Sequence, residues 1–195
     1  IDASHLSSPA REGVRLEKAQ EWGFDPKKPI VVVFGGSQGA AQINHVIKES
    51  MGAISAAGIQ VAHAVGKKNE LPASSTGYKA LPYFEDMDKV YAAADLIIAR
   101  SGAVTCYELG VMGNYALLVP LPVGNGEQSL NGEALVKAGA ASTIPNAEFT
   151  SRWLGDNLIS LLTRAKSWKG NSLKYPLNSA ELIGAQITRD LGVTK

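Results

Sequence analysis

The sequence has little of what marks the more specialised classes of protein. Its single cysteine, Cys106, excludes a disulfide framework within the chain and fits a reducing compartment. A formal net charge of +1 provides no general field for binding nucleic acid. No apolar run approaches membrane-spanning length, no signal segment stands at the start, and no Asp or His cluster suggests a metal site. We therefore expect neither nucleic acid nor a metal or other cofactor among its ligands.

What is present is the composition of an ordinary globular protein, with 45% hydrophobic and 19% charged residues among 195. Continuous apolar runs, typical of strands buried on both faces, alternate with helical patterns. The predicted strands cover residues 30–34, 59–64, 78–81, 95–99, 115–119 and 141–144. The helical patterns cover 14–22, 43–54, 87–93, 104–113, 127–138, 151–164 and 178–191. This alternation predicts an α/β fold with a doubly wound, mostly parallel, Rossmann-like sheet of about six strands.

The turn after the first strand is the strongest local signal. It reads Gly35-Gly36-Ser37-Gln38-Gly39 and opens a helix, so its glycines and the free N–H groups of the helix start could bind an anion. The dinucleotide fingerprint G-x-G-x-x-G does not fit, and Ala40-Ala41 stands where a Walker loop needs Lys-Ser/Thr. The turn alone therefore indicates either a phosphate site of another kind or a tight structural turn.

Two further loops follow predicted strands at the same edge of the sheet. Residues 100–105, Arg-Ser-Gly-Ala-Val-Thr, lead to Glu108, and residues 125–128, Asn-Gly-Glu-Gln, lead to Asn131. In a doubly wound sheet such loops meet outside the carboxyl ends of the strands. Helix N-termini can hold a diphosphate, a carboxylate can accept from two ribose hydroxyls, and amides can bind sugar hydroxyls. The three loops together indicate a nucleotide sugar as the ligand.

Three strings in these loops, GGSQGA, ADLIIARSGAVTCYELGVMG and LPVGNGEQSLNGEALVKAGAA, closely resemble the MurG family of glycosyltransferases. The resemblance runs from about Pro9 to about Phe149 and covers the C-terminal, donor-binding half of a two-domain GT-B fold. It implies that residues 1–29 form a lead-in, an interdomain linker and a first helix, and that residues 30–195 form the donor-binding domain. The N-terminal, acceptor-binding half is expected to be absent from this chain.

The resemblance implies transfer of N-acetylglucosamine from UDP-N-acetylglucosamine to a polyprenyl-diphosphate-linked N-acetylmuramoyl-pentapeptide. This inverting, metal-independent step converts lipid I to lipid II in peptidoglycan synthesis. The full-length protein is expected to associate peripherally with the cytoplasmic face of the bacterial inner membrane. The general base is expected on the acceptor domain, so we expect no catalytic residue in this chain, weak UDP binding and no turnover.

Other interpretations stay open beside this one. They include the donor domain of another GT-B glycosyltransferase or of a UDP-sugar epimerase, and a generic nucleotide-binding module. A nicotinamide- or flavin-binding domain is disfavoured by the missing fingerprint. A non-catalytic interaction domain gains weight only if UDP does not bind.

The resemblance also implies a set of donor-binding residues, namely Arg11, Ser37, Gln38, Phe84, Ala103, Val104, Thr105, Glu108, Glu127 and Gln128. Ser37, with Gln38 alongside, would contact the diphosphate, and Arg11 would reach a phosphate from the linker. Residues 103–105 would lie under the phosphates at a helix start. Phe84 would pair its backbone with the uracil edge.

The remaining roles concern the two sugars. Glu108 would hold the ribose hydroxyls, and Glu127 and Gln128 would bind the hydroxyls of N-acetylglucosamine. Glu127 departs from relatives that have two glutamines at this place. Each residue also has a structural alternative, such as a solvated linker cation for Arg11 or a surface carboxylate for Glu108.

Three other residues are expected to be structural. Arg100 is a salt-bridged structural residue or a weak site candidate. His63 ends the second strand and is either a structural residue or part of the cleft lining. Cys106 is expected to face the core, since no base or metal partner is visible.

Overall fold

The computed structural model describes residues 8–36, 39–122 and 126–168. Ser37, Gln38 and the predicted helix 178–191 lie outside the described residues. The elements in chain order are α1 (Ser8–Trp22), β1 (Ile30–Phe34), α2 (Ala41–Ala56), β2 (Gln60–Ala64), β3 (Tyr78–Leu81), α3 (Met87–Ala93), β4 (Leu96–Ala99), α4 (Ala103–Met112), β5 (Ala116–Leu118), α5 (Glu127–Asn131), α6 (Glu133–Lys137), β6 (Ala141–Thr143) and α7 (Ser151–Ser167). None of the helices described is both long enough and apolar enough to cross a membrane.

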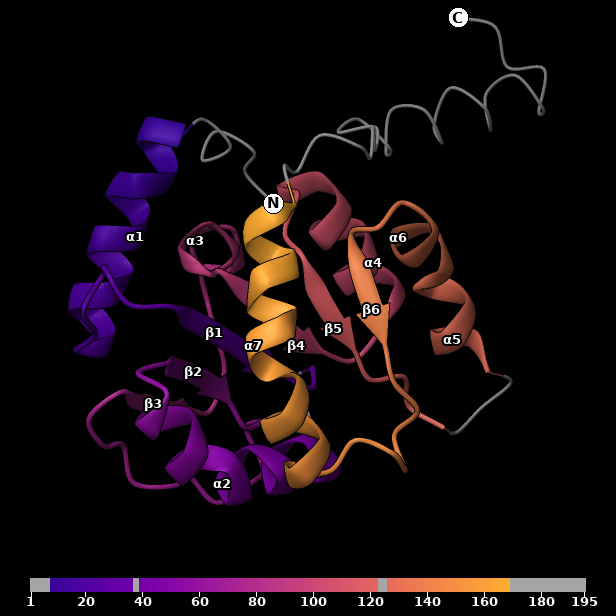
Figure 1. Ribbon diagram of the computed structural model, residues 1–195, viewed down its shortest axis with the longest axis horizontal. Helices are drawn as coiled ribbons and strands as arrows, with labels where there is room; N and C mark the ends of the chain where they lie inside the picture. The colour runs from indigo at the N-terminus through magenta and orange to yellow at the C-terminus, as the bar shows by residue number, and fades with distance from the viewer. Residues whose placement is uncertain (1–7, 37–38, 123–125, 169–195) are drawn as a thin grey trace, which may run out of the picture.

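The strands form one parallel sheet in the order β3-β2-β1-β4-β5-β6 (Figure 1). The chain enters at β1, runs outward to β3, returns to place β4 beside β1, and runs outward again to β6. Every residue of β1 is buried, because helices cover both faces of the sheet. Each predicted strand is present, with its ends within one residue of the expected positions. The predicted doubly wound α/β fold is confirmed.

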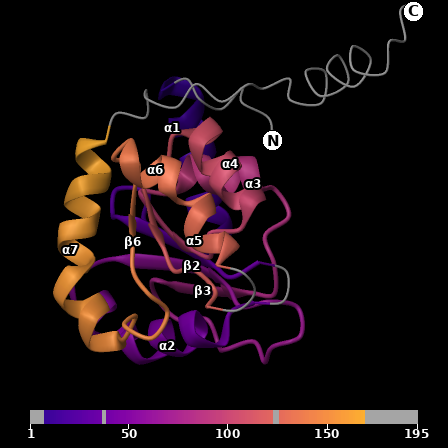
Figure 2. The same cartoon turned by 90° about the vertical axis from the view of Figure 1, so that its right-hand side faces the viewer.

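Two apolar clusters fill the space between the sheet and its two helical layers. On one face, Val31 and Val33 of β1 pack with Ile43 of α2 and Leu154 of α7. On the other face, the cluster joins the sheet to α1, α3, α4 and α6. Figure 2 shows α7 and α2 on one side of the sheet and α3, α4 and α6 on the other. The alternation of side chains along each strand produces this division.

The first helix is longer than predicted. The sequence predicts this helix over residues 14–22, but α1 begins at Ser8 and contains Arg11. Proline fits the first turn of a helix, where its missing N–H group has no partner to lose, so Pro9 does not prevent the helix. The apolar side of α1, with Val14 and Trp22, packs into the same core cluster as α3.

The single helix predicted over residues 127–138 is wrong in one respect, because it is divided into α5 and α6 at Gly132. Glycine is a poor helix former, and here it also allows a close approach to the sheet. A Cβ atom at Gly132 would lie 2.8 Å from Cδ1 of Leu118 in β5. The glycine therefore lets the chain press against β5 where the two helices meet.

Candidate functional site

The candidate site lies where the strand order reverses. β1 and β4 are neighbours, and Phe34 pairs with Ala99 at their carboxyl ends. The chain leaves β1 towards α2 and leaves β4 towards α4, which cover opposite faces of the sheet. Ligands of doubly wound sheets bind in the crevice at this reversal. The structure therefore brings the first two predicted loops together, and the third follows the next strand, β5.

The glycine turn after β1 is packed too tightly for side chains at two of its positions. A Cβ atom at Gly35 would lie 2.3 Å from the Cβ of Ala40, and one at Gly39 would lie 2.0 Å from the carbonyl oxygen of Val65. Gly36 and Gly39 also have positive φ angles of 89° and 75°. The turn brings bare backbone to the start of α2. The predicted diphosphate contacts of Ser37 and Gln38 lie outside the described residues.

Two helices begin at this edge without a capping side chain. The N-cap of α2 is Ala40 and that of α4 is Gly102. Neither residue has a side-chain oxygen that could accept a hydrogen bond from the first turn. The N-cap residues thus supply no capping oxygen to the first N–H groups of either helix, and each helix dipole adds partial positive charge. The exposed side chains of Ala103 and Val104 lie at the start of α4 and line an open hollow of about 400 Å³ together with Glu108.

Glu108 is held by a residue that the sequence did not identify. The hydroxyl of Tyr91 in α3 donates to Oε2 of Glu108 at 3.0 Å, and the Tyr91 ring is fully buried. Burial raises the pKa of the Glu108 carboxyl, while the hydrogen bond from Tyr91 opposes this shift. Burial and the charge of Glu108 in turn raise the pKa of Tyr91. Among the described residues, Oε1 of Glu108 has no hydrogen-bond partner, and it is available to a ligand.

The third loop is tied to the second. The side-chain amide of Asn131 donates to the carbonyl of Ser101 at 3.1 Å, which joins α5 to the turn before α4. Gln128 accepts from the backbone N–H of Leu121 at 3.0 Å through its Oε1, so its Nε2 group is the part left for a ligand. Glu127 is exposed at the start of α5. Sugar contacts by Glu127 and Gln128 stay predictions.

The side chains of Phe84, Arg100 and Cys106 have structural contacts in the folded chain. The Phe84 ring is buried against Trp22, with centroids 6.0 Å apart, so only its backbone could meet a base. Arg100 donates to the carbonyls of Val119 and Pro120 and to Oδ1 of Asn146 at 2.7–3.2 Å, so its structural role rests on neutral acceptors instead of the expected salt bridge. Cys106 is buried, and burial raises the pKa of its thiol to about 11.

Arg11 is not brought to this edge. Its Nη2 group donates to the carbonyl of Met112 at 2.6 Å and to Oδ1 of Asn114 at 3.4 Å. Met112 ends α4, and Asn114 precedes β5, so both acceptors lie at the amino ends of the strands. The glycine turn and the start of α4 lie at the opposite ends. The structure therefore places Arg11 at the opposite end of α4 from Ala103, and its phosphate contact stays a prediction.

His63 is a buried polar residue that, with Asn44 and Val65, also lines an open hollow of about 320 Å³ beside α2. Its side chain, in a residue 1% exposed, lies 3.1 Å from the Tyr78 hydroxyl through Nδ1 and 3.0 Å from Oδ1 of Asn44 through Nε2. Burial lowers the pKa of His63 to about 4. Within the part of the chain that the structure describes, no group of three or more His, Cys, Asp or Glu residues could hold a metal ion.

Acidification should destabilise the fold through His63. Its pKa is about 4 in the folded chain and about 6.5 when unfolded, so the unfolded state binds more protons between these values. The free energy of unfolding should therefore fall as the pH falls from about 6.5 to 4, by about 3 kcal/mol from this group. Urea unfolding at several pH values measures the slope. His63→Gln should reduce it, and an unchanged slope would contradict the assignment.

Comparisons with known proteins identify a family model and similar sequences. The chain matches the family model of the glycosyltransferase family 28 C-terminal domain over residues 30–186. A Corynebacterium glutamicum protein is 46% identical over 156 residues, which is 80% of this chain and 44% of that protein. A Streptomyces avermitilis protein is 43% identical over 157 residues, or 78% and 43% of the two chains. Both are named UDP-N-acetylglucosamine–N-acetylmuramyl-(pentapeptide) pyrophosphoryl-undecaprenol N-acetylglucosamine transferase.

Solved structures show the same fold. The crystal structure of Acinetobacter baumannii MurG matches with a TM-score of 0.70 at 25% identity, over 92% of this chain and 53% of that one. The calicheamicin glycosyltransferase CalG4 matches with a TM-score of 0.61 at 17% identity, over 85% and 45% of the two chains. This second likeness concerns the fold alone. The chain spans less than half the length of the two bacterial relatives named above.

Proposed function

The chain belongs to the family of glycosyltransferase family 28 C-terminal domains, and we propose that it binds UDP-N-acetylglucosamine as the donor half of an N-acetylglucosamine transferase. The acceptor would be the polyprenyl-diphosphate-linked N-acetylmuramoyl-pentapeptide, as in the names of the relatives. The proposed reaction is the conversion of lipid I to lipid II in peptidoglycan synthesis. We also propose that residues 30–195 are the donor domain and that the acceptor domain belongs to the rest of the protein.

The observation that carries this proposal is the pair of uncapped helix starts at the strand reversal, with Glu108 beside them. The N-termini of α2 and α4 both open at the carboxyl edge of adjacent strands. Two such helix starts suit the two phosphates of a diphosphate. The Oε1 atom of Glu108 has no hydrogen-bond partner among the described residues and lies on the helix that starts at Ala103, so it suits the ribose hydroxyls.

The helix starts of α2 and α4 also suit the chemistry proposed for the donor domain, which is to stabilise the leaving diphosphate. As the acceptor hydroxyl attacks the anomeric carbon, negative charge develops on the departing diphosphate. Fixed N–H groups and helix dipoles stabilise such charge without having to reorganise. The general base is assigned to the other half, so this chain alone is expected to bind the donor without turnover. Because the proposed acceptor carries a polyprenyl chain, we also propose that the full-length protein works at a membrane surface and associates with it peripherally.

Calorimetric titration with UDP tests the proposal. The chain should bind UDP and UDP-N-acetylglucosamine weakly, and uridine or pyrophosphate alone more weakly still, because each fills only part of the site. Preference for UDP-N-acetylglucosamine over UDP-glucose would support the named donor, and the reverse would favour another GT-B enzyme. Absence of any heat or chemical-shift change at millimolar UDP would contradict the proposal.

A further inference from the structure

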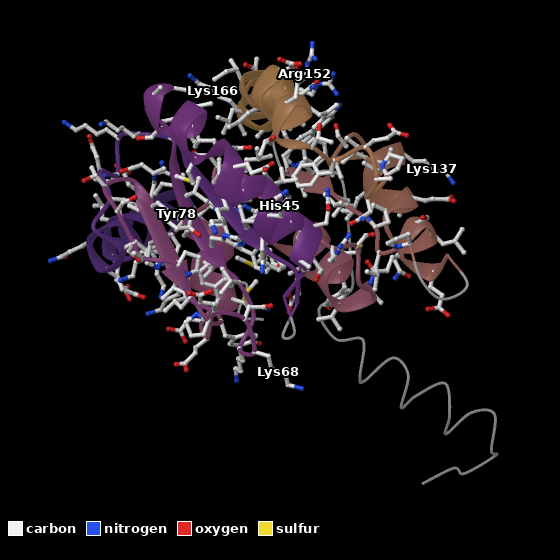
Figure 3. The ribbon with its side chains drawn as sticks, turned by 90° about the horizontal axis from the view of Figure 1, so that it is seen from below. His45, Lys68, Tyr78, Lys137, Arg152 and Lys166 are labelled. Carbon is white, nitrogen blue, oxygen red and sulfur yellow. The ribbon has the colours of Figure 1, made fainter. Side chains whose placement is uncertain are left out.

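A buried hydrogen-bond chain runs from β3 through β2 to the glycine turn. The Tyr78 hydroxyl lies 3.1 Å from Nδ1 of His63, and Nε2 of His63 lies 3.0 Å from Oδ1 of Asn44. Nδ2 of Asn44 then donates to the carbonyl oxygen of Val65 at 2.9 Å. That oxygen lies against Gly39, where it would be 2.0 Å from a Cβ atom. Figure 3 shows α2, marked by His45, beside the strand marked by Tyr78.

The partners determine the direction of each hydrogen bond between Tyr78, His63, Asn44 and Val65. The carbonyl of Val65 can only accept, so the atom of Asn44 that faces it must be the NH₂ group, and Oδ1 must face His63. Nε2 of His63 then carries the hydrogen, and Nδ1 accepts from the Tyr78 hydroxyl. The low pKa of the buried ring fits this neutral form. No polar atom of the ring is left without a partner.

This series of hydrogen bonds ends at two parts of the candidate site, the first turn of α2 and the Val65 carbonyl. Asn44 belongs to the first turn of α2, where its N–H group bonds to the carbonyl of Ala40 at 2.8 Å. Val65 follows β2, and its carbonyl also accepts from the side chain of Asn69 at 2.8 Å. The position of this carbonyl limits how closely Gly39 can approach β2. The pair of His63 and Asn44 therefore connects the first turn of α2 and the Val65 carbonyl beside Gly39 to strands β2 and β3.

We infer that His63 and Asn44 are positioning residues for the donor diphosphate, acting through the Val65 carbonyl and Gly39 without touching the donor. The inference rests on the proposed function, since it assigns the pair to the same turn. A buried histidine that serves only the stability of the core would give the same hydrogen bonds. If the pair positions the donor site, ligand binding should depend on the contact of Nε2 with Asn44 and not on the contact of Nδ1 with Tyr78. If His63 serves only the core, the two contacts should matter equally.

Two substitutions of His63 separate these halves. Glutamine places its NH₂ group near the position of Nε2, so His63→Gln keeps the donor to Asn44 and loses the acceptor for Tyr78. Asparagine reaches only as far as Nδ1, so His63→Asn keeps the contact with Tyr78 and loses the one with Asn44. Asn44→Ala removes the hydrogen bonds beside the glycine turn, and Tyr78→Phe removes the hydrogen bond at the β3 end of the series. Asn44 is half-buried, so its truncation leaves the core in place.

UDP affinity of the full 195-residue chain, measured by calorimetry, tests the inference. Asn44→Ala and His63→Asn should weaken UDP binding about tenfold, the effect of misplacing one hydrogen bond to a charged group. His63→Gln and Tyr78→Phe should stay within about twofold of the wild type. Wild-type affinity in Asn44→Ala, or equal losses in His63→Gln and His63→Asn, would overturn the inference. Failure of the wild-type chain to bind UDP would overturn the proposed function as well.

Amide hydrogen exchange without ligand provides a second test that does not depend on the donor. Asn44→Ala should speed exchange in the peptide that contains Gly39, Ala40 and Ala41, and should leave the later turns of α2 unchanged. Tyr78→Phe should not alter exchange in that peptide. Unchanged exchange in folded Asn44→Ala would overturn the positioning role, whatever the UDP affinity of the variant.

Discussion

Replacing Gly39 with alanine should remove UDP binding and lower the free energy of unfolding by about 3 kcal/mol or more. Two effects add at this position. The backbone has a φ of 75°, which costs a residue with a Cβ atom about 1–2 kcal/mol. The new Cβ atom would also lie 2.0 Å from the Val65 carbonyl oxygen, so the turn must move away from β2. Urea unfolding gives the first quantity and calorimetric titration the second.

Gly36→Ala is the matched control for this substitution. Gly36 has a φ of 89°, but nothing lies within 4 Å of a Cβ atom there. It should show the backbone cost alone, about 1–2 kcal/mol. Equal losses of stability in the two variants would mean that the contact with Val65 does not constrain the turn. Full UDP affinity in Gly39→Ala would mean that the glycine turn is not part of the UDP-binding site.

The sheet could be predicted from the sequence because its strands are buried on both faces. Runs such as Ile30–Phe34 are continuously apolar, and a glycine or a proline within three residues of each strand end marks where the strand stops. The doubly wound arrangement then places the loops after β1, β4 and β5 at one edge. The main features of the candidate site thus follow from local patterns combined with one rule of topology.

Contacts between distant residues could not be predicted in this way. Tyr91 precedes Glu108 by 17 positions on another helix, and no local pattern links a tyrosine in one helix to a carboxylate in the next. The pairing of Asn44 with His63 depends on how α2 lies over β2. Arg11 is a predicted phosphate contact by resemblance to a motif, and its hydrogen bonds to Met112 and Asn114 depend on how α1 packs at the amino edge of the sheet.

Glu108→Ala should weaken UDP binding about a hundredfold or more and leave pyrophosphate binding nearly unchanged. A carboxylate that accepts from two ribose hydroxyls makes two charge-assisted hydrogen bonds, each worth about 1.5–3 kcal/mol. Pyrophosphate has no ribose, so it reports on the helix starts alone. Parallel calorimetric titrations with UDP, uridine and pyrophosphate measure the three affinities.

Glu108→Gln distinguishes loss of the ribose contact from damage to the core. Alanine leaves the buried Tyr91 hydroxyl without its acceptor, whereas glutamine still offers an oxygen at that distance. Glutamine should therefore restore most of the stability lost in Glu108→Ala but only part of the UDP affinity, because the charge is gone. Glu49→Gln, on the exposed side of α2, should alter neither quantity. If UDP affinity followed stability across these variants, Glu108 would be a structural partner of Tyr91 and the ribose would be held elsewhere.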